Sequence, residues 1–559
     1  MTRARGSVPN RRIRLLLAVL VLMFALAFGR TVWLQGIRAE PLARLAESQH
    51  RQTVALPASR GAIYDRTGVQ LAIGERATSV YADPRQVRNP RAVAIAAGQL
   101  LGRDPDDVLE ELADRRRSFV FLRRKADPAA ADAVRRRGLV GVGFLDEERR
   151  AYPQGSIAAH VLGYAGLDND GLAGLEKQLD PVLAGVPGSE TIVKDPFGRA
   201  VKVIRSTPEQ NGRDVHLTLD QNLQANAELV LAKVLRESRA KSATAVVLDP
   251  RSGELLALAV APTFDANRFG ELAAQRTRNL TVTDTYEPGS TFKLITVGAV
   301  LSEGLATPAT AYTLPYEIQV ADRKIHDSHP RDTERMTVAE ILSRSSNVGT
   351  VTLGQELGKR RLARWIEHFG FGRPTGIDFP GETRGIVLPA ERWSDSSIGN
   401  IPIGQGIAVT PVQMAAAYAA VANRGVWVRP HLVRRIGRGP RVRGARKRLV
   451  SRDVAAKLVE MLRGVVDEGG TGTAAAVPGY TVAGKTGTAS KPDERGGYST
   501  SRYVASFVGV VPASDPRLVI LVTIDEPRSA IWGGVVAAPV FADLARFALQ
   551  YLEVPPDAR

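Results

Sequence analysis

The chain has 559 residues, which exceeds the usual size of a single hydrophobic core, so at least two domains are expected. Lys and Arg exceed Asp and Glu by 17 (75 against 58), a balance that favours anionic surroundings such as a membrane surface or an acidic polymer. No recognition helix, zinc motif or aromatic-basic platform supports nucleic acid as a partner. The absence of cysteine excludes disulfides, a thiolate nucleophile and a lipid-modified N-terminal cysteine, and with only 7 His it argues against structural zinc.

The N-terminus combines arginines with an apolar segment. Five arginines up to position 14 precede an apolar run, Leu15 to Gly29, and Trp33 suits a membrane interface. The span from Ile13 to Leu34 has about the 20 residues that a bilayer requires. We expect a cytoplasmic tail (residues 1–12), a transmembrane signal anchor (13–35) and an extracytoplasmic remainder. A cleaved signal peptide is the alternative, because Ala25-Leu26-Ala27 fits a cleavage site.

The region after this segment mixes secondary-structure types. Residues 36–59 predict a helix followed by an extended stretch, and residues 60–210 predict short strands with helices such as Asp106 to Arg116. Breaker clusters at Pro187-Gly188 and Asn211-Gly212 lead us to place a domain boundary near residue 210. The expected domains are therefore 36–210 and 211–555.

The second domain has strand and helix patterns at both of its ends and a helical middle. This order fits a sheet that carries an inserted all-helical lobe, an α/β architecture. The predicted strands are Val215–Leu219, Ala243–Leu248, Leu255–Val260, Ala505–Val511 and Leu518–Ile524, and the predicted flanking helices are Asn222–Arg239 and Val535–Tyr551.

The most informative segment is Tyr286 to Lys293, which reads Tyr-Glu-Pro-Gly-Ser-Thr-Phe-Lys. It leads into a predicted helix, Thr291 to Leu301, so Ser290 and Lys293 would share a face at a helix N-terminus. A serine with a lysine as its base is a known nucleophile pairing. Taken alone, the pattern is more typical of a helix cap with a solvated lysine, because Ser and Lys are common residues.

Two further motifs follow. Ser345-Ser346-Asn347 ends an amphipathic stretch, Thr337 to Ser343, where a simple helix C-terminal turn is the alternative. Lys485-Thr486-Gly487-Thr488 follows the alternating Tyr480 to Ala483 and reads as a glycine-interrupted edge strand. The ordered set S-x-x-K, S-x-N, K-T-G is the signature of the serine penicillin-recognising enzymes.

The chain resembles class B penicillin-binding proteins in particular, and among these the FtsI-type, division-associated transpeptidases. Glu287 and the compact N-terminal region favour this type over its elongation-type relatives. The motifs that carry the resemblance, besides those above, are Gly404-Gln405-Gly406 with Thr410-Pro411 and Gln413, Arg60 to Gly68, Tyr152-Pro153, His160 to Gly163 and Gly171 to Glu176.

The resemblance implies an antiparallel sheet with helices and an all-helical lobe, preceded by an α+β pedestal domain. It also implies the site: Ser290 as nucleophile, Lys293 as base, Ser345 as proton relay, Asn347 as a positioning group and Lys485 as a nearby cation. Thr486, Gly487 and Thr488 would bind the substrate carboxylate, with the backbone N–H groups of Ser290 and Thr488 as the oxyanion hole. For Lys293 to act as a base near neutral pH, burial and a second cation must lower its pKa.

The implied substrate is the D-alanyl-D-alanine end of a peptidoglycan stem peptide, cross-linked to a neighbouring stem without metal or organic cofactor. β-Lactams should acylate the same serine, and an FtsW-like glycosyltransferase is the implied partner among the division proteins. Alternatives that keep the same site are an elongation-type transpeptidase, a D,D-carboxypeptidase, a β-lactamase and a non-catalytic β-lactam sensor or division scaffold. The anchor and upstream domain argue against a free β-lactamase, and the pedestal motifs argue against a glycosyltransferase domain.

Two other segments have simpler interpretations. His326-Asp327-Ser328-His329 contains every residue type of a serine triad, but adjacent residues point to opposite faces of an extended chain. A structural role is expected, since Asp327-Ser328 resembles a family segment that lines the helical lobe. The basic run Arg434 to Arg448 is expected to be a solvated loop, with contact to an anionic envelope polymer as the alternative.

Overall fold

The computed structural model describes residues 10–37, 40, 51–194, 200–271, 273–493 and 496–558. The chain forms two compact units, residues 1–58 with 185–211 and residues 59–184 with 212–559. Most of the expected pedestal region therefore folds within the same unit as the C-terminal half of the chain. The predicted boundary near residue 210 stays a prediction.

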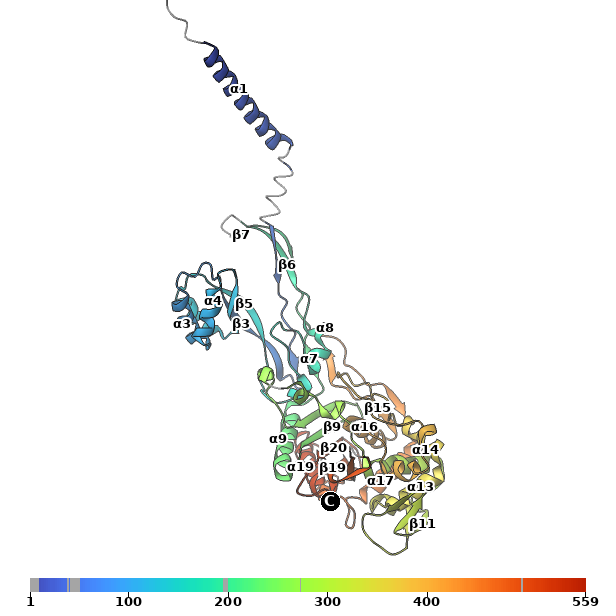
Figure 1. Cartoon of the computed structure of the whole chain (residues 1–559). Helices are drawn as coiled ribbons and strands as arrows, with labels where there is room; N and C mark the ends of the chain where they lie inside the picture. The colour runs from blue at the N-terminus through green and yellow to red at the C-terminus, as the bar shows by residue number, and fades with distance from the viewer. Residues whose placement is uncertain are drawn as a thin grey trace, which may run out of the picture. The chain divides into compact units, whose positions relative to one another are not determined.

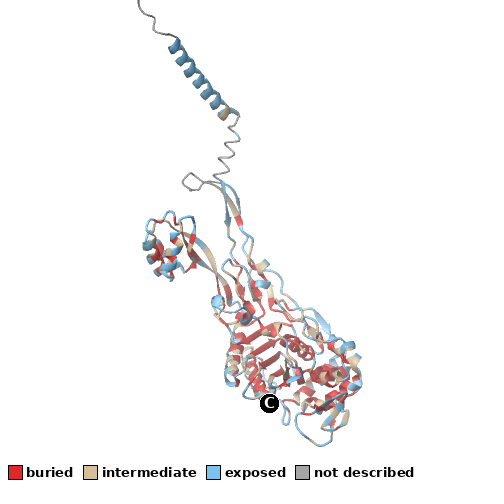
Figure 2. Cartoon of the chain, in the orientation of Figure 1, coloured by how far each residue is buried: buried red, intermediate tan, exposed pale blue. Residues whose placement is uncertain are grey.

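The first unit contains the predicted membrane segment and a small sheet. Helix α1 (Asn10–Val32) continues into a π-helical turn, η1 (Trp33–Ile37), and its apolar side chains are exposed along its length (Figure 2). Among the described residues, Arg11–Gly36 is the one helical segment long and apolar enough to cross a membrane. The helix predicted just after residue 36 falls largely on residues outside those described.

The predicted extended stretch before Pro57 is confirmed as a strand. It is β1 (Arg51–Leu56), and it pairs antiparallel with β6 (Gly188–Lys194), which pairs in turn with β7 (Ala200–Thr207). The three strands form a sheet in the order β1-β6-β7.

Residues 59–184 of the second unit carry a long two-stranded ribbon with a small helical cap (Figure 1). Strand β3 (Gln70–Ala82) pairs antiparallel with β5 (Val142–Ala151) and with β4 (Val120–Ala126). Three helices pack on this ribbon, and each begins with a proline after a side-chain N-cap, a combination that satisfies free N–H groups at a helix start. They are α3 (Pro90–Leu101, cap Asn89), α4 (Pro105–Ala113, cap Asp104) and α5 (Pro128–Arg136, cap Asp127).

A buried ion-pair cluster joins two of the sequence motifs of this region. Glu176 is fully buried and accepts hydrogen bonds from Arg60 Nε at 2.7 Å and Arg150 Nε at 2.6 Å. Removing one partner of such a pair typically costs about 3–5 kcal/mol, because the other charge stays buried. The cluster therefore fixes α7 (Gly174–Gln178), which carries Glu176, against Arg150 of the ribbon, and Arg60 also bonds Asp180 of α8 (Asp180–Leu183) at 2.7 Å. A third short helix of this region is α6 (Ala159–Leu162).

A mixed sheet connects the two halves of the second unit. Strand β2 (Ile63–Tyr64) pairs parallel with β8 (Val215–Leu217), and β8 pairs antiparallel with β16 (Val433–Ile436). The sheet order is β16-β8-β2-β3-β4, so strands separated by more than 350 residues in the sequence share one sheet.

The C-terminal half is built on a five-stranded antiparallel sheet in the order β10-β9-β20-β19-β18. Alternate residues of β9 face opposite sides: Ala245 and Val247 pack with α9 and α19, whereas Val246 and Leu248 pack with α11 and α16. Burial is concentrated here (Figure 2). The bounds are β9 (Ser242–Leu248), β10 (Leu255–Ala261), β18 (Ala483–Pro492), β19 (Tyr498–Val511), β20 (Leu518–Asp525), α9 (Gln221–Ser238), α11 (Lys293–Ser302), α16 (Pro411–Ala422), α18 (Gly533–Val536) and α19 (Ala538–Tyr551).

The chain between β10 and β18 supplies the predicted helical lobe. Its main helices are α12 (Val338–Ser343), α13 (Asn347–Leu357), α14 (Lys359–His368) and α17 (Arg452–Arg463), and its hairpins are β11 (Ala311–Leu314) with β14 (Glu334–Thr337), and β12 (Glu317–Val320) with β13 (Arg323–His326). The remaining short elements are α10 (Leu280–Thr283), α15 (Ser397–Asn400) and the 3-10 turns η2 (Ala266–Glu271), η3 (Ala274–Thr277), η4 (Gly289–Phe292), η5 (Ala390–Arg392), η6 (Ile401–Ile403) and η7 (Thr473–Ala475).

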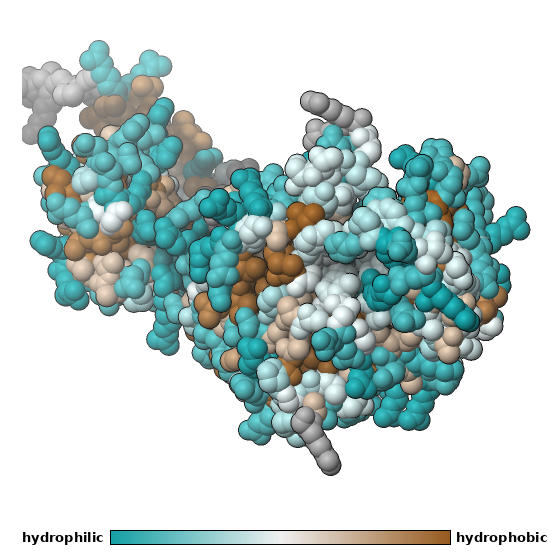
Figure 3. All heavy atoms as spheres, turned by 90° about the horizontal axis from the view of Figure 1, so that it is seen from below, coloured by the Kyte–Doolittle hydropathy of each residue, from teal (hydrophilic) through white to brown (hydrophobic). Residues whose placement is uncertain are grey.

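The basic run is only partly a loop, which corrects the sequence prediction. Its ends form β16 and β17 (Arg446–Arg448), and β17 pairs with β15 (Val426–Val428). Seen from below, the molecular surface is mostly hydrophilic with a few apolar clusters (Figure 3), as expected for a globular region.

Candidate active site

The loop before Ser290 is pinned to a second loop, residues 404–409. Tyr286 and Val409 exchange backbone hydrogen bonds of 3.0 and 2.9 Å, and Gly289 N–H donates to Gly404 O at 3.0 Å. Thr291 is held through its carbonyl, which accepts from the buried hydroxyl of Tyr418 at 2.7 Å. Ser290 lies half-buried in η4 directly before α11, so the predicted position at a helix N-terminus is observed.

Two glycines allow these segments to approach one another. Gly404 has φ +81°, and a Cβ there would lie 2.2 Å from Gly289 O. A Cβ on Gly487 would lie 3.0 Å from Pro288 O and 2.3 Å from Ser506 Oγ. Any larger residue would separate the β18 edge strand or the 404–409 loop from the nucleophile loop.

The second motif lies between two helices rather than only at the end of one. Ser345 follows α12 with φ +61°, in the left-handed region that non-glycine residues rarely adopt. Ser346 then caps α13, its Oγ accepting from Gly349 N–H at 2.9 Å. The strained turn aims Ser345 and Asn347 together at Lys293.

The two motif lysines converge on one hydroxyl. Lys293 Nζ lies 2.6 Å from Ser345 O, 2.7 Å from Asn347 Oδ1 and 3.2 Å from Ser345 Oγ. Lys485 Nζ donates to the same Ser345 Oγ at 2.8 Å. Both lysines have no exposed surface, so segments nearly 200 residues apart in sequence meet in a buried polar centre.

Burial changes the protonation of both amines. Desolvation, with the nearby Lys485 charge as the second cause, lowers the pKa of Lys293 well below its usual range, and the Asp327 carboxylate partly offsets this. Desolvation lowers the pKa of Lys485 to about 7. Because desolvation and the Lys485 charge both lower the pKa of Lys293, whereas desolvation alone lowers that of Lys485, we expect Lys293 to lose its proton first.

The third motif alternates across an edge strand. Lys485 faces Ser345, while Thr486 and Thr488 lie on the other face of β18. The hydroxyls of Thr486 and Thr471 are 2.9 Å apart, and Thr488 Oγ1 accepts from Gly533 N–H at 3.1 Å. The proton of the Thr488 hydroxyl therefore remains free to donate to a ligand.

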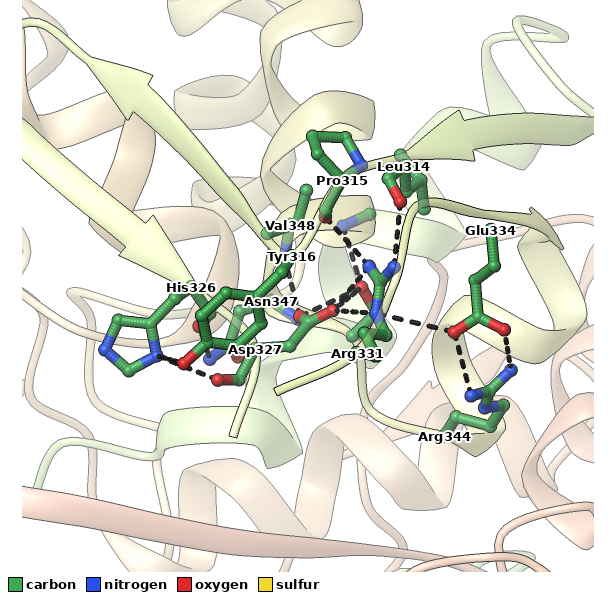
Figure 4. A network of polar contacts seen from close by, with 12 residues as sticks. Leu314, Pro315, Tyr316, His326, Asp327, Arg331, Glu334, Arg344, Asn347 and Val348 are labelled. Atoms are coloured by element: carbon green, nitrogen blue, oxygen red, sulfur yellow. Dashed lines mark hydrogen bonds and ion pairs between the residues drawn. The ribbon is translucent and has the colours of Figure 1, made fainter. Parts of the chain in front are cut away.

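Asp327 supports the site through contacts that the sequence did not predict, although a structural role was expected for it. Its carboxylate accepts hydrogen bonds from Asn347 N–H at 2.6 Å and Val348 N–H at 3.0 Å, at the positive end of α13 (Figure 4). Ser346 Oγ also donates to it at 3.0 Å. It therefore fixes the backbone from which Asn347 reaches Lys293, in agreement with the predicted structural role.

Arg331 holds Asp327 in place from the other side. Its guanidinium donates to Asp327 Oδ2 at 2.9 and 2.7 Å and to the carbonyls of Leu314 and Pro315, and it approaches Glu334 at 3.5 Å (Figure 4). Sequence spacing alone gives no signal that Arg331 belongs to this network.

The structure thus brings Lys293, Ser345, Asn347 and Lys485 into hydrogen-bonded contact, with Ser290 one helical turn before Lys293. Gly487 packs against the nucleophile loop, and the hydroxyls of Thr486 and Thr488 pair with Thr471 and the Gly533 N–H. Within the described ranges, no group of three or more His, Cys, Asp or Glu side chains could hold a metal ion.

Two family models match the chain. The model of the penicillin binding protein transpeptidase domain matches residues 243–546, and that of the penicillin-binding protein dimerisation domain matches residues 55–217. The first match alone spans more than half of the chain.

Individual relatives agree with the family models. Peptidoglycan D,D-transpeptidase FtsI of Escherichia coli is 32% identical over 98% of this chain and 93% of its own length. The probable peptidoglycan D,D-transpeptidase PenA of Neisseria gonorrhoeae is 35% identical over 98% of this chain and 94% of its own length. The crystal structure of penicillin binding protein 3 from Mycobacterium tuberculosis, complexed with aztreonam, superposes with a TM-score of 0.72 at 31% identity, covering 90% of this chain and 98% of that one. The motif-based prediction is confirmed: this chain belongs to the penicillin-binding proteins, in the class B arrangement of a dimerisation domain followed by a transpeptidase domain.

Proposed function

We propose that this protein is a serine-type peptidoglycan D,D-transpeptidase that works through an acyl-enzyme on Ser290. The observation that carries the proposal is the convergence of two buried lysines on Ser345 beside that serine. The names of FtsI and PenA support the activity.

Acylation begins with transfer of the Ser290 proton to Lys293. A neutral Lys293 donates its two protons to Ser345 O and Asn347 Oδ1, its shortest contacts, and keeps its lone pair for a hydroxyl proton. Ser290 Oγ attacks the penultimate carbonyl of D-alanyl-D-alanine. The proton passes through Ser345 to the leaving amine, the C–N bond breaks and D-alanine departs. A neutral amine of a neighbouring stem then attacks the ester carbonyl, its proton passes to Ser290 Oγ, the ester C–O bond breaks, and the cross-link forms.

The substrate carboxylate is held by β18. Thr488 donates its free hydroxyl proton, Thr486 contributes a second hydroxyl, and Lys485 supplies positive charge from behind the strand. The backbone N–H groups of Ser290 and Thr488 form the oxyanion hole, where one donor is typically worth about 3–4 kcal/mol. The strained amide of a β-lactam presents the same carbonyl and carboxylate.

The membrane segment and the cellular role are part of the same proposal. Helix α1 anchors the protein, with the arginine-rich end in the cytoplasm and the catalytic half outside. We extend the proposal to septal wall synthesis with an FtsW-like glycosyltransferase as partner, as the FtsI-type motifs of the sequence imply.

A cross-linking assay tests the proposed reaction. Purified protein with uncross-linked glycan strands should yield dimeric stem peptides and free D-alanine, detected by mass spectrometry of the digested product. Penicillin should suppress both. Release of D-alanine without dimers would identify a D,D-carboxypeptidase instead.

Asp327→Asn is expected to slow penicillin acylation by about 10- to 100-fold. The amide keeps the shape but loses charge-assisted bonds to Asn347 and Val348 and leaves Arg331 with only its 3.5 Å ion pair to Glu334. The second-order acylation rate constant measures the effect. Glu334→Gln is the matched control, because Glu334 is the outer partner of Arg331 and also pairs with Arg344, without contacting Asn347 or Val348. Equal rates in the two variants would contradict the positioning role.

A further inference from the structure

A cavity of about 430 Å³ opens beside the nucleophile loop. Its walls include residues 284–287, which precede Ser290, residues 489–492, which follow Thr488 on β18, and residues 406–408. A ligand in this cavity would therefore adjoin the proposed acyl-enzyme.

The charged groups around the cavity are paired, with one exception. Asp284 pairs with Arg278, Asp525 with Lys491 at 2.8 Å, and Lys241 with Glu526 at 3.8 Å. Within the part of the chain that the structure describes, Glu287 has no cationic partner.

Glu287 has only one satisfied oxygen. Its Oε1 accepts from Gly406 N–H at 3.0 Å and from the Tyr498 hydroxyl at 3.1 Å, whereas Oε2 is buried without any hydrogen-bond partner. Burial accordingly raises the pKa of this carboxyl. A buried carboxylate oxygen without a donor is costly, so a ligand that supplies one gains that free energy on binding.

The missing partner is a hydrogen-bond donor, and a cation that carries N–H groups adds charge attraction to the bond. A primary ammonium meets this requirement, because it offers three donors as a point charge at the end of an alkyl chain. The terminal torsion of a glutamate is broad, so Oε2 can turn toward a donor that enters from the cavity.

We propose that the cavity binds the primary ammonium of a diamino-acid side chain in a stem peptide, with Glu287 as its counter-charge. This inference rests on the proposed function and names a recognition element of its substrate. The ammonium has two possible sources, the donor stem before acylation and the acceptor stem after it.

Glu287→Gln tests the proposal with paired substrates. The substrates are synthetic D-alanyl-D-alanine pentapeptides whose side-chain amine is either free or acetylated. If the donor stem uses the cavity, the wild-type preference in acylation kcat/KM for the free amine should fall about 10-fold or more in the variant. If the acceptor uses it, the ratio of aminolysis to hydrolysis with an added free-amine peptide should fall instead. Tyr498→Phe keeps the carboxylate and should retain the preference. No change in either ratio would overturn the site.

Calorimetry separates this site from the proposed reaction. With Ser290→Ala protein, the free-amine peptide should bind more tightly than its acetylated form, and adding Glu287→Gln should abolish the difference. If the Ser290→Ala protein binds the two peptides equally, the ammonium site is refuted, and the proposed transpeptidase reaction is not affected. Absence of penicillin labelling in the wild-type protein would refute the proposed function and leave the binding result to decide the cavity.

Discussion

Ser290→Ala is expected to abolish covalent labelling by fluorescent penicillin. Without Oγ no ester can form, while the surrounding loop keeps its backbone bonds to residues 404–409 and its fold. Labelled protein quantified after denaturing electrophoresis measures the effect, and the signal should fall to background.

Ser302→Ala provides the matched control, since its hydroxyl bonds only within α11, to Gly298 O at 2.6 Å. This variant should label like the wild type. Labelling that survives in Ser290→Ala would refute the nucleophile assignment and require another residue to carry the acyl group.

Lys293→Met is expected to reduce acylation by about 100- to 10,000-fold, the range typical of a lost general base. Methionine fills similar space without an amine, and Lys293 is fully buried, so the variant avoids a large cavity. Removing the desolvated amine is favourable, but Ser345 O and Asn347 Oδ1 lose a donor, so we expect only a small change in the melting temperature. Stopped-flow acylation and a thermal melt together separate loss of the base from loss of the fold.

The pH profile of the wild-type protein follows from the same burial. Because the pKa of Lys293 is lowered well below its usual range, a larger share of this amine is neutral at a given pH than of an exposed lysine. The acylation rate should fall as the pH decreases through that lowered pKa, since protonation removes the lone pair. A profile that instead rises only near the ordinary lysine pKa of about 10.4 would contradict this assignment.

The sequence predicted the motifs and their elements better than the contacts between them. The helix Asn222–Arg239 appears as Gln221–Ser238, and the strand Leu518–Ile524 as Leu518–Asp525, because apolar periodicity specifies such elements locally. The second motif was different. No periodic signal marks the left-handed turn at Ser345 that starts a new helix at Asn347.

The supporting network was beyond sequence reasoning for a physical reason. Asp327 caps the start of α13 and pairs with Arg331 in the segment between β13 and β14, and such contacts depend on where α13 begins in space. The unsatisfied oxygen of Glu287 is likewise a property of the packed loop rather than of the residue type.

The mixed sheet has a practical consequence for protein production. Strand β8 lies between β2 from the start of the second unit and β16 from near its end. A truncated chain starting at residue 211 would lose β2 and present β8 as an open edge, ready to recruit a strand from another molecule. Soluble fragments should therefore begin before residue 59, so that β2 is present to pair with β8 in the same polypeptide.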